Sequence, residues 1–304
     1  MISLCSVRFA QYCFLFIPSA LDRHDFVRNG SLIIKNGIMS DFIKVTDDLG
    51  REVNIPFPPK RIISTVPSTT EFLFDLGLGN RVISRTKFCK YPESDIAKLP
   101  NIGGTKDLYI DKIRLLDPDL ILVNEEENKK EQIEALLDEF PVYVCKVRNY
   151  DKALQNILNT GKIVGSEPKS FEIANTIQAS FSQLPVNLKS QSVLYLIWKD
   201  PYMVAGKDTF INSMIEKCGF RNAIEDKDSR YPKMTTEEII DLNPDLVFLS
   251  SEPFSFTKKH IQEIQNLLPN TKIELVDGEM FSWFESHLLK AGKYLNDLIQ
   301  KINS

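Results

Sequence analysis

The apolar and polar positions of this chain repeat one phrase. Residues 110–123, IDKIRLLDPDLILV, combine helically spaced apolar positions with a Pro-Asp-Leu stop and a continuous apolar run. Residues 236–249, TEEIIDLNPDLVFL, keep the same order at an offset of 126 positions, since 237 minus 111 and 244 minus 118 both give this number. Each copy predicts a short helix followed by a buried strand. The duplication predicts two lobes built on one plan.

The first lobe is predicted over residues 44–149. Its strands read as continuous apolar runs separated by helical segments, a pattern that implies a mostly parallel sheet covered by helices on both faces. The predicted elements, in chain order, are a hairpin in KVTDDLGREVNI, a strand in KRIISTV, a helix beginning at Pro67 and Ser68, a strand in VISRT, a loop from Phe88 to Asp107, the repeated helix and strand, a helix in ENKKEQIEALLDEF and a strand in VYVCKV.

The middle of the chain, residues 150–188, carries helical spacing and no strand pattern. In the run KSFEIANTIQASFSQL one apolar stripe is predicted to comprise Phe171, Ala174, Ile177, Phe181 and Leu184. This run lacks the Gly, Ser and Pro repeats of a flexible linker. We therefore expect these helices to join the lobes rigidly.

The second lobe is predicted over residues 189–304 and repeats the order of the first. Strands are predicted in SVLYLIW, YMVAG, DLVFLS and KIELVD, and a helix in DTFINSMIEKCG is expected to have Asp208 as its cap and Gly219 as its stop. A last helix closes the chain through SHLLKAGKYLNDLIQKI. The predicted fold class is α/β, with two lobes of mostly parallel sheets flanked by helices and joined by one long α-helix.

Composition narrows the classes of function. The chain has 304 residues, of which 43% are hydrophobic, so it is long enough to bury two cores. Its formal net charge of -4 argues against the basic surface that binds nucleic acid. No apolar run approaches the roughly 20 residues of a membrane span. Residues 1–43 are interpreted as a weak secretory signal or a disordered segment, with a translation start at Met39 as the alternative.

Catalytic signatures are missing from the sequence. It has no G-x-G-x-x-G after a strand, no G-x-S-x-G and no H-E-x-x-H, and in VAGKDT the residue after Lys207 is Asp208 where a phosphate loop has Ser or Thr. Its three histidines, at positions 24, 260 and 287, are not clustered as metal ligands are. We therefore predict no enzyme activity, no bound metal and no cofactor.

Aromatic residues instead gather in loops and at strand ends. In open parallel sheets these loops form the ligand crevice, and aromatic walls with a few polar groups, such as Lys106, Ser251 and Glu252, suit a large, flat, partly apolar ligand. Any single aromatic is as plausibly a core residue. The aromatic set is Phe88, Tyr91, Tyr109, Trp198, Tyr202, Tyr231, Phe281, Trp283 and Phe284.

Four stretches together carry a family resemblance. The runs KRIISTVPSTTEFLFDLGLGNRVISRT, GGTKDLYIDKIRLLDPDLILV, WKDPYMVAGKDTFINSMIEKCGF and TTEEIIDLNPDLVFLSSEP resemble the substrate-binding proteins of ABC importers whose lobes are joined by a single helix. Within that class the chain is most similar to the cobalamin-binding and ferric-siderophore-binding branch. The resemblance extends from Val45 to the C-terminus and implies a ligand that is a corrinoid or an iron chelate, such as a siderophore or haem.

The resemblance also implies roles for particular residues. The matching permease-docking carboxylates are Asp111 and Glu237, which the repeat places in the first turn of equivalent helices; without docking, each would serve only its helix dipole. The implied partner is an ABC permease dimer with its ATPase subunits, and the implied location is the periplasm or the outer face of the cytoplasmic membrane. We expect a monomer. The matching ligand-cleft positions are Phe88, Tyr91, Lys106, Trp198, Tyr202, Tyr231, Phe281 and Trp283.

Two alternatives remain open from the sequence. One is a cytoplasmic cofactor-handling protein or enzyme on the same bilobed scaffold, which a start at Met39 favours. The other is an interaction module whose cleft is empty. The mature N-terminus and any ligand carried through purification discriminate among these functions.

Overall fold

The computed structural model describes residues 42–185, 190–224 and 229–304. The signal or disordered segment predicted for residues 1–43, including the alternative start at Met39, lies outside these ranges except for its last two residues. Phe42 and Ile43 belong to the first strand of a hairpin. No helix of the described ranges is long and apolar enough to cross a membrane.

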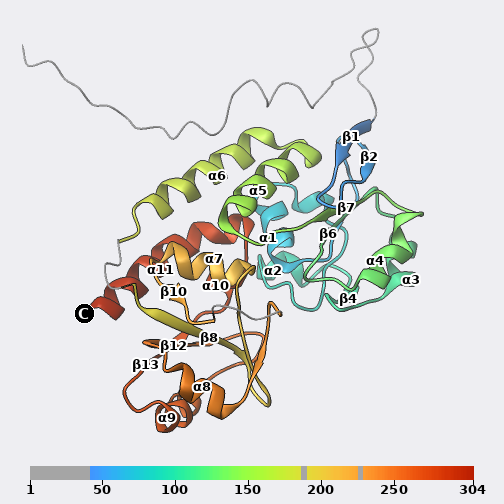
Figure 1. Ribbon diagram of the computed structural model, residues 1–304. Helices are drawn as coiled ribbons and strands as arrows, with labels where there is room; N and C mark the ends of the chain where they lie inside the picture. Colours follow the sequence, from blue (N-terminus) through green and yellow to red (C-terminus); the bar gives the residue numbers. More distant parts are fainter. Residues whose placement is uncertain (1–41, 186–189, 225–228) are drawn as a thin grey trace, which may run out of the picture. The chain divides into compact units, whose positions relative to one another are not determined.

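The first lobe contains a parallel sheet in the order β3-β6-β7, preceded by the antiparallel hairpin of β1 and β2 (Figure 1). All residues of β3, β6 and β7 are buried, as the continuous apolar runs predict. The elements are β1 (Phe42–Thr46), β2 (Glu52–Pro56), β3 (Ile62–Ser64), α1 (Pro67–Asp75), η1 (Gly79–Arg81), α2 (Glu93–Ile96), β4 (Gly103–Gly104), β5 (Asp107–Leu108), α3 (Ile110–Leu116), β6 (Leu120–Asn124), α4 (Lys130–Leu137) and β7 (Val142–Cys145).

Two helices, α5 (Tyr150–Val164) and α6 (Glu167–Ser182), follow the first lobe and pack on each other (Figure 1). Gly161 of α5 lies so close to α6 that a Cβ atom there would be 1.9 Å from Ser170 Oγ. A Cβ on Gly292 of the last helix would likewise be 2.0 Å from Ser180 Oγ. Both glycines thus let a neighbouring helix approach α6 closely.

The second lobe repeats the three parallel strands as β8-β12-β13 and adds an antiparallel edge of β9 and β11. Short strand β10 pairs with β8 off this path. The elements are β8 (Ser192–Trp198), β9 (Tyr202–Val204), α7 (Phe210–Lys217), β10 (Arg221–Asn222), β11 (Lys233–Met234), α8 (Thr236–Leu242), β12 (Leu246–Ser250), α9 (Lys258–Leu267), β13 (Lys272–Val276), α10 (Glu279–Ser282), η2 (Glu285–His287) and α11 (Leu288–Asn303).

The repeated phrase forms equivalent elements in both lobes. In each lobe a seven-residue helix, α3 or α8, leads into the middle one of the three parallel strands, β6 or β12. Both helices end at a residue in the left-handed conformation, Asp117 with φ 44° and Asn243 with φ 42°. The two lobes therefore share one plan down to the backbone conformation of the stop.

Three local predictions are corrected. VISRT forms no regular strand but only isolated bridges, at Val82 and at Arg85, because few of its backbone groups find a partner strand. Phe171 is 59% exposed and does not join the buried stripe of α6. The cap of α7 is Thr209, whose Oγ1 accepts the N–H of Asn212 at 3.0 Å, and not Asp208.

Candidate functional site

The loop after β6 is held in a fixed shape by buried asparagines. The side-chain oxygen of Asn124 accepts the backbone N–H groups of Glu126 at 2.8 Å and Glu127 at 3.1 Å. The side-chain oxygen of Asn128 accepts the N–H of Asn124 at 3.0 Å. These bonds satisfy the backbone at the strand end and direct three consecutive glutamates out of the sheet.

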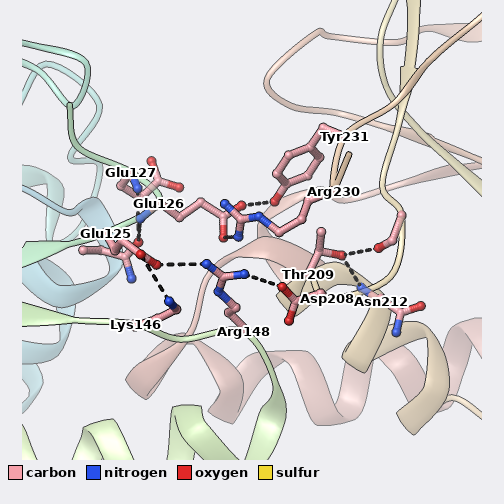
Figure 2. Close-up of polar contacts among 12 residues, drawn as sticks. Glu125, Glu126, Glu127, Lys146, Arg148, Asp208, Thr209, Asn212, Arg230 and Tyr231 are labelled. Atoms are coloured by element: carbon pink, nitrogen blue, oxygen red, sulfur yellow. Dashed lines mark hydrogen bonds and ion pairs between the residues drawn. The ribbon is translucent and has the colours of Figure 1, made fainter. Parts of the chain in front are cut away.

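Glu126 of this loop binds the second lobe directly (Figure 2). Its carboxylate forms an ion pair with Arg230 at 2.9 Å and accepts the phenol O–H of Tyr231. Burial, and then the charge of Glu126, raise the pKa of Tyr231, which therefore stays a hydrogen-bond donor at neutral pH. The ammonium of Lys106 donates to the backbone carbonyl of Glu126.

A second ion-pair cluster lies beside the first. Arg148 donates to Glu125 at 3.1 Å and to Asp208 of the second lobe, and Lys146 lies 3.2 Å from Glu125 (Figure 2). Burial raises the pKa of Glu125, but the hydrogen bonds from Arg148 and Lys146 outweigh this effect and lower it overall. Asp208 thus serves as a contact between the lobes rather than as a helix cap.

The loop after β12 presents the matching carboxylate, Glu252. It accepts the indole N–H of Trp283 at 2.9 Å and the hydroxyl of Ser282 at 3.0 Å. Lys90 of the first lobe lies 3.6 Å from Glu252 and donates to Glu279. Burial raises the pKa of Glu252, and the charge of Lys90 offsets part of that increase.

Buried titratable groups continue from this cluster toward the linking helices. Glu71 of α1 binds His287 at 2.7 Å and Lys290 at 2.6 Å. Burial raises the pKa of Glu71, but the bonds to His287 and Lys290 outweigh this effect and lower the pKa overall. Glu285 is fully buried, and its carboxylate accepts from Asn156 at 2.9 Å. Burial raises the pKa of Glu285 to about 8.

The structure brings four of the predicted ligand residues to these loops. Tyr91 and Trp283 meet edge to face with ring centroids 6.0 Å apart, and the Tyr91 hydroxyl lies 3.3 Å from Glu279. Tyr231 and Lys106 both bind Glu126. These four residues therefore belong to one boundary between the lobes.

The remaining predicted aromatics differ in burial. Phe88 is 48% and Trp198 is 40% exposed, and Trp198 contacts Phe254 with ring centroids 5.7 Å apart. Tyr202 is half-buried and packs on the core of the second lobe. The role of Phe88, Trp198 and Tyr202 in ligand binding stays a prediction.

The prediction that Phe281 contacts the ligand is corrected by its burial. It is fully buried, with its ring centroid 5.2 Å from that of Tyr195 and 5.9 Å from that of Phe248, so it is a core residue in this structure. Its place after the last strand suggested a loop, but α10 turns the side chain inward.

Sequence reasoning missed the charged residues of the boundary. These residues lie in loops without a regular pattern, so periodicity carried no signal for them. The repeated phrase did carry a signal, because its offset of 126 positions also relates Glu126 to Glu252. The missed residues are Lys90, Glu126, Arg148 and Arg230.

The predicted docking carboxylates lie on helix surfaces. The Asp111 side chain is 93% exposed in the first turn of α3 and pairs with Arg114 at 3.0 Å, while Arg114 also binds Glu139. Glu237 is exposed in the first turn of α8. Glu238, next to it, closes a capping box with Thr235 and so stabilises the helix itself.

Two further features bear on the choice of site. A cavity of about 700 Å³ is lined by Ser192 and Asp245, at the amino-terminal ends of β8 and β12, whereas open parallel sheets bind ligands beyond the carboxyl ends. The carboxylate-bearing loops are therefore the better candidate site. Within residues 42–185, 190–224 and 229–304, no group of three or more His, Cys, Asp or Glu side chains is placed to hold a metal ion.

The sequence matches known proteins over most of its length. Residues 62–267 match the model of a family described as periplasmic binding protein. An ABC transporter substrate-binding lipoprotein of Bacillus subtilis is 28% identical over 216 residues, which cover 67% of this chain and 68% of that protein. A vitamin B12-binding protein of Vibrio cholerae is 23% identical over 199 residues, covering 64% and 72% of the two chains.

Solved structures show the same fold. A possible iron-binding (periplasmic solute-binding) protein of Staphylococcus epidermidis superposes with a TM-score of 0.66 at 25% identity, over 81% of this chain and 100% of that one. A periplasmic catecholate-siderophore binding protein of Vibrio cholerae gives a TM-score of 0.70 at 15% identity, over 86% and 99%. The predicted fold class, α/β lobes joined by a helical connection, is confirmed.

Proposed function

Because this chain belongs to the periplasmic binding protein family, we propose that it is the substrate-binding component of an ABC importer. It binds a corrinoid or an iron chelate between its lobes and delivers this ligand to a permease. The observation that carries the proposal is that the loops beyond β6 and β12, one from each lobe, each form an ion pair with the other lobe, Glu126 with Arg230 and Glu252 with Lys90. A ligand held there touches both lobes at once.

The aromatic residues at this boundary supply the apolar contact area. Tyr91, Tyr231 and Trp283 carry a polar atom each and a broad ring, which suits a flat ligand with a polar edge. Lys106, Phe88, Trp198 and Tyr202 complete the proposed contact set, and Phe281 supports it from the core. Binding alone, without chemical conversion of the ligand, is the proposed activity.

The proposed partner is an ABC permease dimer with its ATPase subunits. Asp111 and Glu237 occupy equivalent first turns on the two lobes, and such a pair matches a two-fold symmetric partner, since complementary charges steer the encounter. The binding protein acts as a monomer in the periplasm or at the outer face of the cytoplasmic membrane.

Calorimetry or tryptophan quenching tests the proposal. The purified chain is titrated with cyanocobalamin, dicyanocobinamide, haem and several ferric siderophores, and at least one is expected to bind in the micromolar range or tighter. Failure of all of them to bind more tightly than about 1 mM would contradict the proposal. Mass spectrometry of the mature N-terminus tests export.

A further inference from the structure

The offset that relates the two lobes also relates two carboxylates of the site. Glu126 stands two residues after β6 and Glu252 two residues after β12, and 252 minus 126 gives the same 126 positions as the repeated phrase. Each carboxylate therefore lies beyond the carboxyl end of the middle one of the three parallel strands of its own lobe. The two are pseudo-symmetric partners across the site.

Their ionic contacts are reciprocal. Glu126 of the first lobe pairs with Arg230 of the second at 2.9 Å, and Glu252 of the second lobe lies 3.6 Å from Lys90 of the first. Each lobe thus contributes one carboxylate and one base. Lys90 also pairs with Glu279, and Lys106 lies beside Glu126, where it donates to the backbone carbonyl.

A ligand that enters between the loops must separate these pairs. Two carboxylates and two bases then face it, and a charge left buried without a partner is strongly unfavourable. A polyanionic ligand satisfies Arg230 and Lys90 but places like charge against Glu126 and Glu252. A carboxamide satisfies both kinds of group, because its N–H donates to a carboxylate and its C=O accepts from a base.

We propose that Glu126 and Glu252 select a neutral ligand fringed with carboxamides, the class to which corrinoids belong, over haem and polyanionic iron chelates. This proposal rests on the function proposed above and names the ligand class of the same site. Burial raises the pKa of the neighbouring Glu127, the charge of Lys106 opposes this, and the charges of Glu126 and Glu252 raise it further. Selectivity arises from repulsion of the wrong ligand as well as attraction of the right one.

The test compares ligand charge on the unmodified protein. Cyanocobalamin and dicyanocobinamide, both fringed with carboxamides, are titrated beside haem and ferric enterobactin, a tris-catecholate polyanion. We expect the amide-fringed ligands to bind at least about 10-fold more tightly, with a gap that narrows as salt rises. Tighter binding of either anion overturns this proposal while leaving the importer function standing. Binding of none of the four overturns this proposal, and failure of the wider siderophore series as well overturns the function with it.

Matched variants identify the responsible groups. Glu126→Gln and Glu252→Gln keep the shape of each side chain and remove its charge. In the double variant, binding of ferric enterobactin is expected to strengthen at least about 10-fold, because like-charge repulsion is lost, while binding of cyanocobalamin weakens several-fold, because its carboxamides lose their charged acceptors. Glu134→Gln on α4, whose exposed side chain pairs with Lys130, is the control and should change neither affinity. An unchanged affinity for the anion in the double variant assigns the selectivity elsewhere and contradicts the proposal.

Discussion

Asp117 and Asn243 end α3 and α8 in the same left-handed conformation, with φ angles of 44° and 42°. Each donates its backbone N–H to the carbonyl three residues earlier, Arg114 or Ile240. The repeated phrase therefore encodes a helix stop, and in both lobes this stop turns the chain into the middle one of the three parallel strands.

Glycine at these stops should stabilise the protein. Asp117→Gly and Asn243→Gly remove the steric penalty of the left-handed conformation, which we expect to raise the free energy of unfolding by about 0.5–1 kcal/mol each. Asp117→Val should lower it, since a β-branched residue tolerates positive φ poorly. Urea unfolding measures both changes. A loss of stability in both glycine variants would contradict this assignment.

Close helix contact at α6 gives a second prediction. In an open helix Gly→Ala stabilises by about 1 kcal/mol, but Gly292→Ala places a methyl group against Ser180 and should instead destabilise by about 1–3 kcal/mol. Ser180→Gly in the same chain restores the space. The double variant should therefore recover much of the loss, and purely additive effects in this cycle would exclude direct contact.

The fully buried Glu285 predicts a pH dependence of stability. Because its folded pKa, about 8, exceeds its ordinary value of 4.5, the folded state binds this proton more tightly than the unfolded state. The resulting stability is fully present below pH 4.5 and is lost as the pH rises to about 8, at about 1.4 kcal/mol per unit.

Glu285→Gln checks this account. The free energy of unfolding of the variant should fall less steeply between pH 5 and pH 8 than that of the unmodified chain. The difference between the two proteins should therefore favour the variant most at pH 8. Denaturant unfolding at four pH values measures the slope, with Glu134→Gln as the exposed control. Parallel slopes for all three proteins would show that Glu285 titrates normally.

Charge reversal tests the docking surface. Asp111→Arg and Glu237→Arg should each lower ligand uptake by a reconstituted importer several-fold and leave ligand affinity unchanged, because both residues lie on the outer surface of their helices. Lys112→Glu and Glu131→Arg are matched reversals of exposed residues. Glu238 is unsuitable as a control because it caps α8. Intact uptake in both variants, or lost ligand binding, would assign these carboxylates to helix stability alone.

Ligand binding should change the arrangement of the lobes only slightly. The α6 helix packs against both α5 and α11 through the close contacts at Gly161 and Gly292, and such a connection resists bending. Scattering curves with and without ligand should nearly superimpose. A marked compaction on binding would place a hinge in this connection.

The sequence by itself determined the elements and their repetition. Apolar runs such as LILV and LVFL are short and follow a Pro-Asp turn, which favours strands buried on both faces. Helical spacing depends on residues near one another in the chain, so β6, β12 and the linking helices were all predictable. The same offset already related Asp111 to Glu237. Local patterns therefore sufficed for the fold class.

Only the tertiary structure decided which loop residues meet. The partners Glu126 and Arg230 are 104 positions apart, and Glu279 and Lys90 are 189 apart, distances at which no periodicity links them. Burial of an aromatic ring at a strand end is likewise set by neighbouring elements, which is why Phe281 became core and Trp198 remained exposed. Contacts between lobes depend on how two sheets face each other, and that arrangement is a property of the packed chain rather than of any segment.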